Sequence, residues 1–161
     1  MEAAIAGTPR LFQINVSDGG VPKLPVHQVQ VTPEGITGDR QADQEHHGGP
    51  RQAICLYALE RIVALQEEGH PIFPGSTGEN LTVAGLDWAQ VIPGARLLLG
   101  DGTVVEVTKY TKPCPKIEHS FADGEVDRMA HQAHPGWARV YARVLVPGNI
   151  QTGDRIYLLG D

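Results

Sequence analysis

A cysteine held between two prolines is the feature of this sequence that most directly suggests chemistry. Cys114 lies in Thr111-Lys-Pro-Cys-Pro-Lys116, and neither neighbouring proline has the N–H group that strand pairing requires. We therefore expect the thiol on a stiff loop. Lys109, Lys112 and Lys116 surround it, and nearby positive charge favours the thiolate that acts as a nucleophile or binds a soft metal. The alternative is an unreactive cysteine in a turn bounded by prolines.

The second cysteine, Cys55, has a different setting. It lies between Ile54 and Leu56 in an apolar run, which predicts a small core residue. Two cysteines are too few for a disulfide framework, and their number fits a reducing compartment.

A segment rich in glycine and charge, Gly38–Arg51, is a second candidate for chemistry. It contains two arginines, two histidines, two aspartates and three glycines. Glycines let a backbone approach a ligand closely, and arginines bind phosphate in bidentate fashion, so the segment could hold an anionic cofactor. It matches neither the P-loop nor the dinucleotide fingerprint, and a polar surface loop is the alternative. His46 and His47 would point in opposite directions on an extended chain, so at most one faces a site.

A third candidate is the loop Gly75-Ser-Thr-Gly-Glu-Asn-Leu81, which leads into a strand. Asn80 could offer its amide to a heteroaromatic ring, and Glu79 could exchange protons. Glycine loops before a strand are common, and a purely structural role is the alternative.

A zinc site is disfavoured. Cys114 and His119 are five residues apart, and the further ligand candidates are His46, His47 and Asp43. No C-x-x-C pair and no H-E-x-x-H motif is present. The G-x-S-x-G pattern is also absent, so a serine hydrolase is unsupported.

Alternating apolar and polar residues predict the strands that position these segments. Strands are expected at residues 11–16, 24–31, 51–57, 80–83, 97–99, 104–107, 137–146 and 155–159. An amphipathic helix is expected over residues 58–68, and a short helix over 125–132. Many short strands without a regular alternation of strand and helix favour a mainly β fold, a closed or half-closed β-barrel with a few short helices.

Composition limits the classes of function. The 161 residues, with 19 glycines and 12 prolines, predict a single turn-rich domain over residues 1–161. The net charge of −6 argues against nucleic acid or an anionic membrane as partner. No secretion signal and no run of about 20 apolar residues is present, so we expect a cytoplasmic protein.

Taken together and in this order, the three candidate segments resemble the MOSC domain, the molybdenum-cofactor sulfurase C-terminal domain family, in its short stand-alone bacterial form. The matching pieces are Gly35–Asp43 with His47–Pro50, then Gly78–Thr82, then Pro113–Lys116. The resemblance extends from about Leu11 to Leu159. Long family members carry Arg-Pro-Asn where this chain has Gly78-Glu-Asn80, so one cation is missing from the cofactor side.

The resemblance implies a β-barrel whose single family cysteine, here Cys114, binds the molybdenum of the pterin cofactor molybdopterin or carries sulfur to it. Catalytic members reduce N-hydroxylated bases and amidoximes. Carried over position by position, the resemblance makes Cys114 the catalytic metal ligand. It implies that the cofactor is bound by Arg40, His47, Arg51, Asn80, Thr111 and Lys116.

Three functions follow as hypotheses. The first is a molybdenum-cofactor-dependent oxidoreductase that reduces small N-hydroxylated molecules and takes electrons from a separate reductase. The second is a sulfur carrier in which Cys114 becomes a persulfide, supplied by a sulfur donor protein and working without pyridoxal phosphate. The third is a binding module that holds the pterin without catalysis. Replacing Cys114 by serine should abolish the first two and leave pterin binding in the third.

Overall fold

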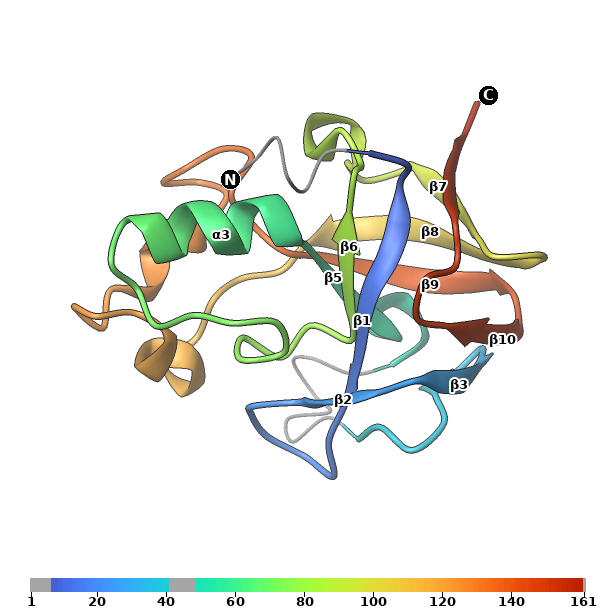
Figure 1. The fold of residues 1–161 in the computed structure, drawn as a ribbon, viewed down its shortest axis with the longest axis horizontal. Coiled ribbons are helices and arrows are strands. Elements are labelled where there is room, and N and C mark those ends of the chain that lie inside the picture. Colours follow the sequence, from blue (N-terminus) through green and yellow to red (C-terminus); the bar gives the residue numbers. More distant parts are fainter. Residues whose placement is uncertain (1–6, 41–48, 161) are drawn as a thin grey trace.

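The computed structural model describes residues 7–40 and 49–160 of the chain. Its largest element is an eight-stranded sheet in the order β11-β7-β8-β9-β5-β6-β1-β2 (Figure 1). The strands are β1 (Arg10–Val16), β2 (Leu24–Val26), β5 (Ile54–Ala58), β6 (Leu81–Ala84), β7 (Arg96–Leu99), β8 (Thr103–Tyr110), β9 (Val140–Val146) and β11 (Ile156–Leu159). Neighbouring strands are antiparallel except β5 and β6. Helix α3 (Leu59–Glu67) forms the crossover between these two parallel strands.

A smaller sheet has the order β10-β3-β4. It comprises β3 (Gln28–Thr32), β4 (Gly35–Ile36) and β10 (Gly148–Gln151). The other elements are the 3-10 helices η1 (Pro50–Gln52), η2 (Trp88–Gln90), η3 (Pro115–Ser120) and η4 (Val126–Met129). No helix among residues 7–40 and 49–160 is long and apolar enough to cross a membrane.

The mainly β architecture with few helices is confirmed. The closed form of the barrel is not observed, because the eight-stranded sheet has no continuous ladder between β1 and β11. These strands meet only where they begin, at a single bridge between Arg10 and Arg155. Backbone hydrogen bonds from Leu11 to Asp154 (2.8 Å) and from Ile156 to Pro9 (2.9 Å) accompany the bridge.

Several expected elements are confirmed with shifted ends. Helix α3 buries Leu59, Ile62 and Leu65, and the chain leaves it at Gly69, whose φ is 100°. The expected strand over residues 24–31 is wrong, since it breaks at His27 into β2 and β3, which belong to different sheets. The expected helix over 125–132 is the single turn η4.

Side-chain alternation gives the large sheet one apolar face and one that carries polar groups. In β5, Ile54 and Leu56 project to one side of the strand and Cys55 and Tyr57 to the other, where the Tyr57 ring is itself part of the hydrophobic core. Tyr57 lies opposite Thr82 of β6, and Thr82 lies opposite Gln13 of β1. We call the face that carries Cys55, Tyr57 and Thr82 the polar face, and Asn80 and Thr111 contact Cys55 there.

Candidate functional site

Asn80 joins three parts of the chain on the polar face. Its side chain is completely buried. The carbonyl oxygen accepts a hydrogen bond from the Cys55 amide at 3.0 Å, and the amide group donates to Asp39 at 2.9 Å and to the Asn15 carbonyl at 3.4 Å. The polar groups of Asn80 are therefore engaged within the protein, where they hold β5, β1 and the segment ending at Arg40 together.

Asp39 and Lys23 form a buried ion pair beside Asn80. The Lys23 Nζ atom lies 2.6 Å from Asp39 Oδ1, and both side chains are almost fully enclosed, with relative exposures of 6% and 5%. The same carboxylate accepts a hydrogen bond from the Ser17 amide at 3.0 Å. Since a buried charge is costly unless it is paired, this geometry fixes the segment that leads to Arg40. Sequence reasoning missed Lys23, because a single lysine in a turn gives no local signal.

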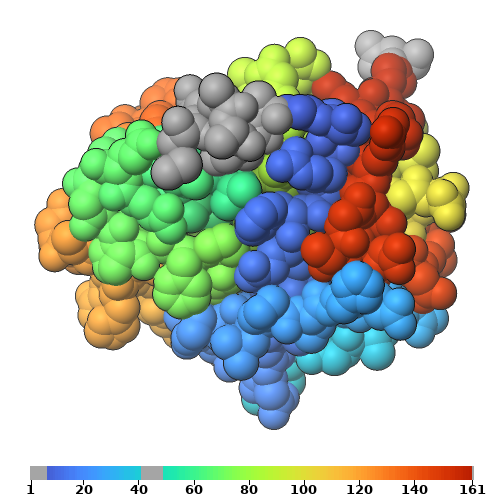
Figure 2. Space-filling view, in the orientation of Figure 1, coloured from blue at the N-terminus to red at the C-terminus, as the bar shows by residue number. Residues whose placement is uncertain are grey.

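Glu79 is enclosed by hydrogen-bond donors from its own loop. Its carboxylate accepts from the Gly75 amide (3.0 Å), the Thr77 hydroxyl (3.1 Å) and the Thr82 hydroxyl (3.0 Å). Burial raises the pKa of Glu79, and these donors oppose the rise. Glu79 therefore clamps the loop and is not placed to exchange protons with a ligand. Figure 2 shows this loop's surface beside the segment before β2, where the Lys23 amide donates to the Gly75 carbonyl at 2.9 Å.

Cys114 lies where the sequence predicts, on the loop between β8 and η3. It precedes the first residue of η3, and its carbonyl accepts the Ile117 amide at 3.1 Å. The residue is partly exposed and forms no disulfide. The flanking Lys112 and Lys116 are exposed, and Lys109 lies over the ring of Tyr141 at 5.9 Å. Cys114 is thus partly accessible from solvent.

Thr111 connects the Cys114 loop to the polar face. Its side chain is buried, and its hydroxyl lies 3.7 Å from the Cys55 sulfur. Its amide donates to the Arg139 carbonyl at 2.9 Å, which extends the pairing of β8 with β9 by one residue. A continuous path of contacts therefore runs from Asp39 through Asn80 and Cys55 to the start of the Cys114 loop.

The proposed anion-binding residues lie further out. Arg40 is exposed, with Nε 3.2 Å from the Asp18 carboxylate, and Arg51 is exposed on η1. The Arg51 carbonyl accepts a hydrogen bond from Thr108 of β8 at 2.6 Å, so η1 is attached to the strand that leads to Thr111. His47 lies outside the described residues, as do His46 and Asp43. The structure brings Asn80 and Thr111 to either side of Cys55, and neither forms a hydrogen bond with the side chain of Arg40, Arg51 or Lys116.

Arg139 is a buried cation that sequence reasoning missed. It is 5% exposed, and one guanidinium nitrogen, Nη1, donates to the Thr77 carbonyl. Its Nε atom is buried without a hydrogen-bond partner. The available signal was a charged residue within the apolar alternation of residues 137–146, where an outward-facing position was the simpler interpretation.

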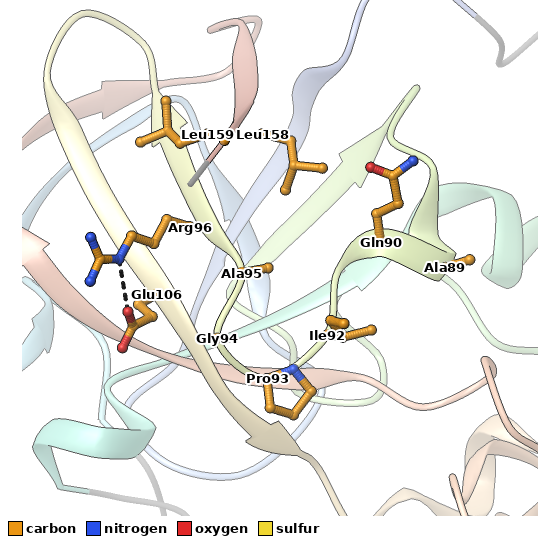
Figure 3. Close-up of a pocket in the computed structure, with 11 residues that line it drawn as sticks. Ala89, Gln90, Ile92, Pro93, Gly94, Ala95, Arg96, Glu106, Leu158 and Leu159 are labelled. Atoms are coloured by element: carbon orange, nitrogen blue, oxygen red, sulfur yellow. Dashed lines mark hydrogen bonds and ion pairs between the residues drawn. The ribbon is translucent and has the colours of Figure 1, made fainter.

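A groove of about 700 Å³ lies elsewhere, between η2, the start of β7 and the end of β11 (Figure 3). Its walls include Ile92, Leu158 and Leu159, and its only charged side chains are the ion pair of Arg96 with Glu106 at 2.8 Å. None of the candidate residues lines it, so it is separate from the Cys114 site.

Comparison with known proteins gives a family and several relatives. A model of the MOSC domain matches residues 43–157. An uncharacterized protein of Bacillus subtilis, YflK, is 36% identical over 142 residues, which are 87% of this chain and 63% of YflK. A Gibberella moniliformis protein named "Reductase" is 32% identical over 130 residues, which are 78% of this chain and 22% of that protein.

Among solved structures, YiiM from Geobacillus stearothermophilus is 28% identical, with a TM-score of 0.69 over 94% of this chain and 75% of that one. The chain thus spans less than two thirds of the length of YflK and under a quarter of that of the reductase.

Proposed function

Because this chain belongs to the MOSC domain family, a family associated with molybdenum-cofactor binding, we propose that it binds a molybdenum cofactor through Cys114 and reduces small N-hydroxylated compounds. The observation that carries the proposal is the Cys114 thiol itself. The residue is partly exposed on a proline-bounded loop that follows β8, three residues after Thr111. A thiolate in this position suits a soft metal ligand.

The described residues suit a metal ion whose remaining ligands come from its cofactor. Residues 7–40 and 49–160 contain no group of three or more His, Cys, Asp or Glu side chains that could hold a metal ion. In this proposal Cys114 is the protein ligand of a metal whose other ligands come from its cofactor. The buried Nε of Arg139, which lacks a partner, is consistent with an anionic group nearby.

The buried contacts behind the loop support a positioning role for Asn80 and Thr111. Asn80 holds the Cys55 backbone and Asp39, and Thr111 touches both Cys55 and Arg139. A rigid outer shell fixes a metal ligand in one geometry and lowers the cost of binding. We assign the anionic cofactor groups to the exposed cations Arg40, Arg51 and Lys116, together with His47.

The proposed reaction needs an electron donor. Reducing an N–OH group to N–H consumes two electrons and two protons and releases water. When bound, the cofactor supplies this two-electron chemistry. The two cysteines of the chain are too few for an iron–sulfur cluster, so we propose a separate reductase as partner. A cytoplasmic setting would keep the Cys114 thiol reduced.

An anaerobic assay tests the function. Protein from a cofactor-competent host is mixed with chemically reduced viologen and an N-hydroxylated base or an amidoxime, and viologen oxidation is followed. We expect turnover by the wild type and by the control Arg96→Gln, which changes the distant groove, and at least a hundredfold loss in Cys114→Ser. Equal activity in Cys114→Ser would contradict the proposal. Inactive, metal-free wild type carrying a persulfide on Cys114 would also contradict it and would support the sulfur carrier.

A further inference from the structure

Two cations are buried near the polar face, and only one has a counter-ion in contact. Lys23 pairs with Asp39 at 2.6 Å. Arg139 is equally buried, yet no carboxylate lies within 4.0 Å of its guanidinium in the part of the chain that the structure describes. Within the described residues, the guanidinium makes one hydrogen bond, from Nη1 to the Thr77 carbonyl, and Nε has no hydrogen-bond partner.

Glu79, a buried carboxylate of the adjoining loop, makes no direct contact with the Arg139 guanidinium. Its oxygens accept hydrogen bonds from Gly75, Thr77 and Thr82, and none from Arg139. Leaving a guanidinium buried without a direct partner is costly, because the protein interior solvates charge poorly. Such a cost is typical of sites where stability is given up for binding.

The position of Arg139 connects this charge to the Cys114 loop. Its carbonyl accepts the Thr111 amide, three residues before Cys114. Two residues further along, Tyr141 lies opposite Cys55, so Arg139 projects from the polar face by the alternation of the strand. Burial raises the pKa values of Cys55 and Tyr57; the charge of Arg139 opposes this rise, and the carboxylate of Glu79 adds to it.

We propose that Arg139 is the electrostatic determinant of anion binding at the Cys114 site: its charge, which no carboxylate of the described residues contacts, stabilises a tetrahedral oxyanionic group held beside the loop. This inference rests on the proposed function, since it names the charge that would favour an anionic cofactor. A phosphate monoester and a molybdate-like oxyanion share this chemistry. Because a charge in the interior acts over several ångströms, direct contact with the guanidinium is not required.

A purely structural role for Arg139 makes the opposite prediction. If its task is to tie the 75–79 loop to β9 through the Thr77 carbonyl, replacing it by methionine lowers the thermal stability of the ligand-free protein. If its charge is kept for binding, Arg139→Met removes a buried charge that has no carboxylate in contact. That variant then unfolds at the same temperature as the wild type or higher, while losing affinity for anions.

The test uses ligand-free protein and needs no cofactor. Thermal unfolding is recorded for the wild type, Arg139→Met, Arg139→Lys and the control Arg143→Met, with phosphate or molybdate added at constant ionic strength. Arg143 lies on the same strand, β9, but its guanidinium is partly exposed and pairs with Glu106 at 2.6 Å. Titration by calorimetry then gives the dissociation constants.

We expect the oxyanion to raise the melting temperature of the wild type, Arg139→Lys and Arg143→Met, with at least tenfold weaker binding in Arg139→Met. If phosphate alone raises the melting temperature, the group bound near Arg139 is a phosphate monoester. If molybdate alone raises it, the bound group is the metal oxyanion. Equal binding by Arg139→Met, or no response of the wild type to either anion, would overturn the inference. Absence of molybdenum or of reductase activity would overturn the proposed function and leave a positive anion result intact.

Discussion

The side-chain amide of Asn80 donates a hydrogen bond to the carboxylate of Asp39 at 2.9 Å, and both side chains are buried. The two residues lie 41 positions apart in the sequence. Their contact brings the charged segment that ends at Arg40 against the glycine loop that leads into β6. Because Lys23 shares the same carboxylate, Asp39 is the centre of a buried cluster beneath the candidate site.

Asp39→Asn should therefore be strongly destabilising. It leaves the buried ammonium of Lys23 without its counter-ion, and breaking one side of a buried ion pair costs about 3–5 kcal/mol. The free energy of unfolding in urea measures this loss. The matched control is Asp18→Asn, which breaks the exposed pair with Arg40 and should cost at most about 1 kcal/mol. Equal effects of the two substitutions would show that the Lys23–Asp39 pair contributes nothing beyond an exposed pair.

The two cysteines should differ sharply in reactivity. Cys55 is 3% exposed, and burial raises the pKa of its thiol, whereas Cys114 is partly exposed on its loop. Iodoacetamide should label Cys114 in the native protein and Cys55 only after unfolding, since the thiolate is the reacting form. Peptide mapping by mass spectrometry reads out both sites. Comparable native labelling rates would mean that Cys55 is not enclosed as described.

Tyr57 should make stability fall at alkaline pH. Burial raises the pKa of Tyr57 well above its ordinary value of about 10, so the folded state holds the phenolic proton more tightly than the unfolded chain does. The stabilisation is complete below about pH 10 and is lost as the pH rises further. Tyr57→Phe should lose about 1 kcal/mol at neutral pH, because its hydroxyl donates to the Trp137 carbonyl at 2.6 Å.

The same variant should show a shallower decline of stability above pH 10. Urea unfolding at a series of pH values compares it with the wild type. Parallel declines in the two proteins would assign the alkaline sensitivity to other groups.

Gly75 should be intolerant of alanine. Its φ of 88° is unfavourable for other residues, and an added Cβ would overlap the Lys23 carbonyl oxygen. Gly94 has a similar φ of 96° but open space around its Cβ position. Gly94→Ala should therefore cost about 1–2 kcal/mol, the conformational penalty alone, while Gly75→Ala should cost more. Thermal unfolding measures the stability lost by each variant. Equal losses would show that the Gly75 loop accommodates the added Cβ without a further energetic cost.

Much of the fold could be predicted because its signals are local. Alternation with period two predicts β1, short apolar runs predict the cores of β7 and β8, and the prolines beside Cys114 predict its loop. The division of residues 24–31 into two strands could not be predicted, because it depends on pairing with β1 and β10 from distant parts of the chain. The local sequence pattern does not indicate which distant strand pairs with a given segment.

The candidate-site residues could be predicted only where the residue type and its immediate neighbours in sequence suggest a role. A cysteine between two prolines and an asparagine after a glycine-rich loop are candidate site residues in any sequence. The burial of Lys23 and Arg139 arises from long-range packing, and neither has neighbours in sequence that indicate it. For the same reason, the use of Asn80 and Glu79 within the protein framework became evident only from the contacts.

The measurement that most directly tests the central claim is the ratio of molybdenum to protein. Wild type and Cys114→Ser are purified without oxygen from a host that makes the cofactor, and molybdenum and zinc are determined by elemental analysis. The account predicts close to one molybdenum per wild-type chain and none in Cys114→Ser. Wild-type protein without molybdenum, or with one zinc per chain in its place, would contradict it.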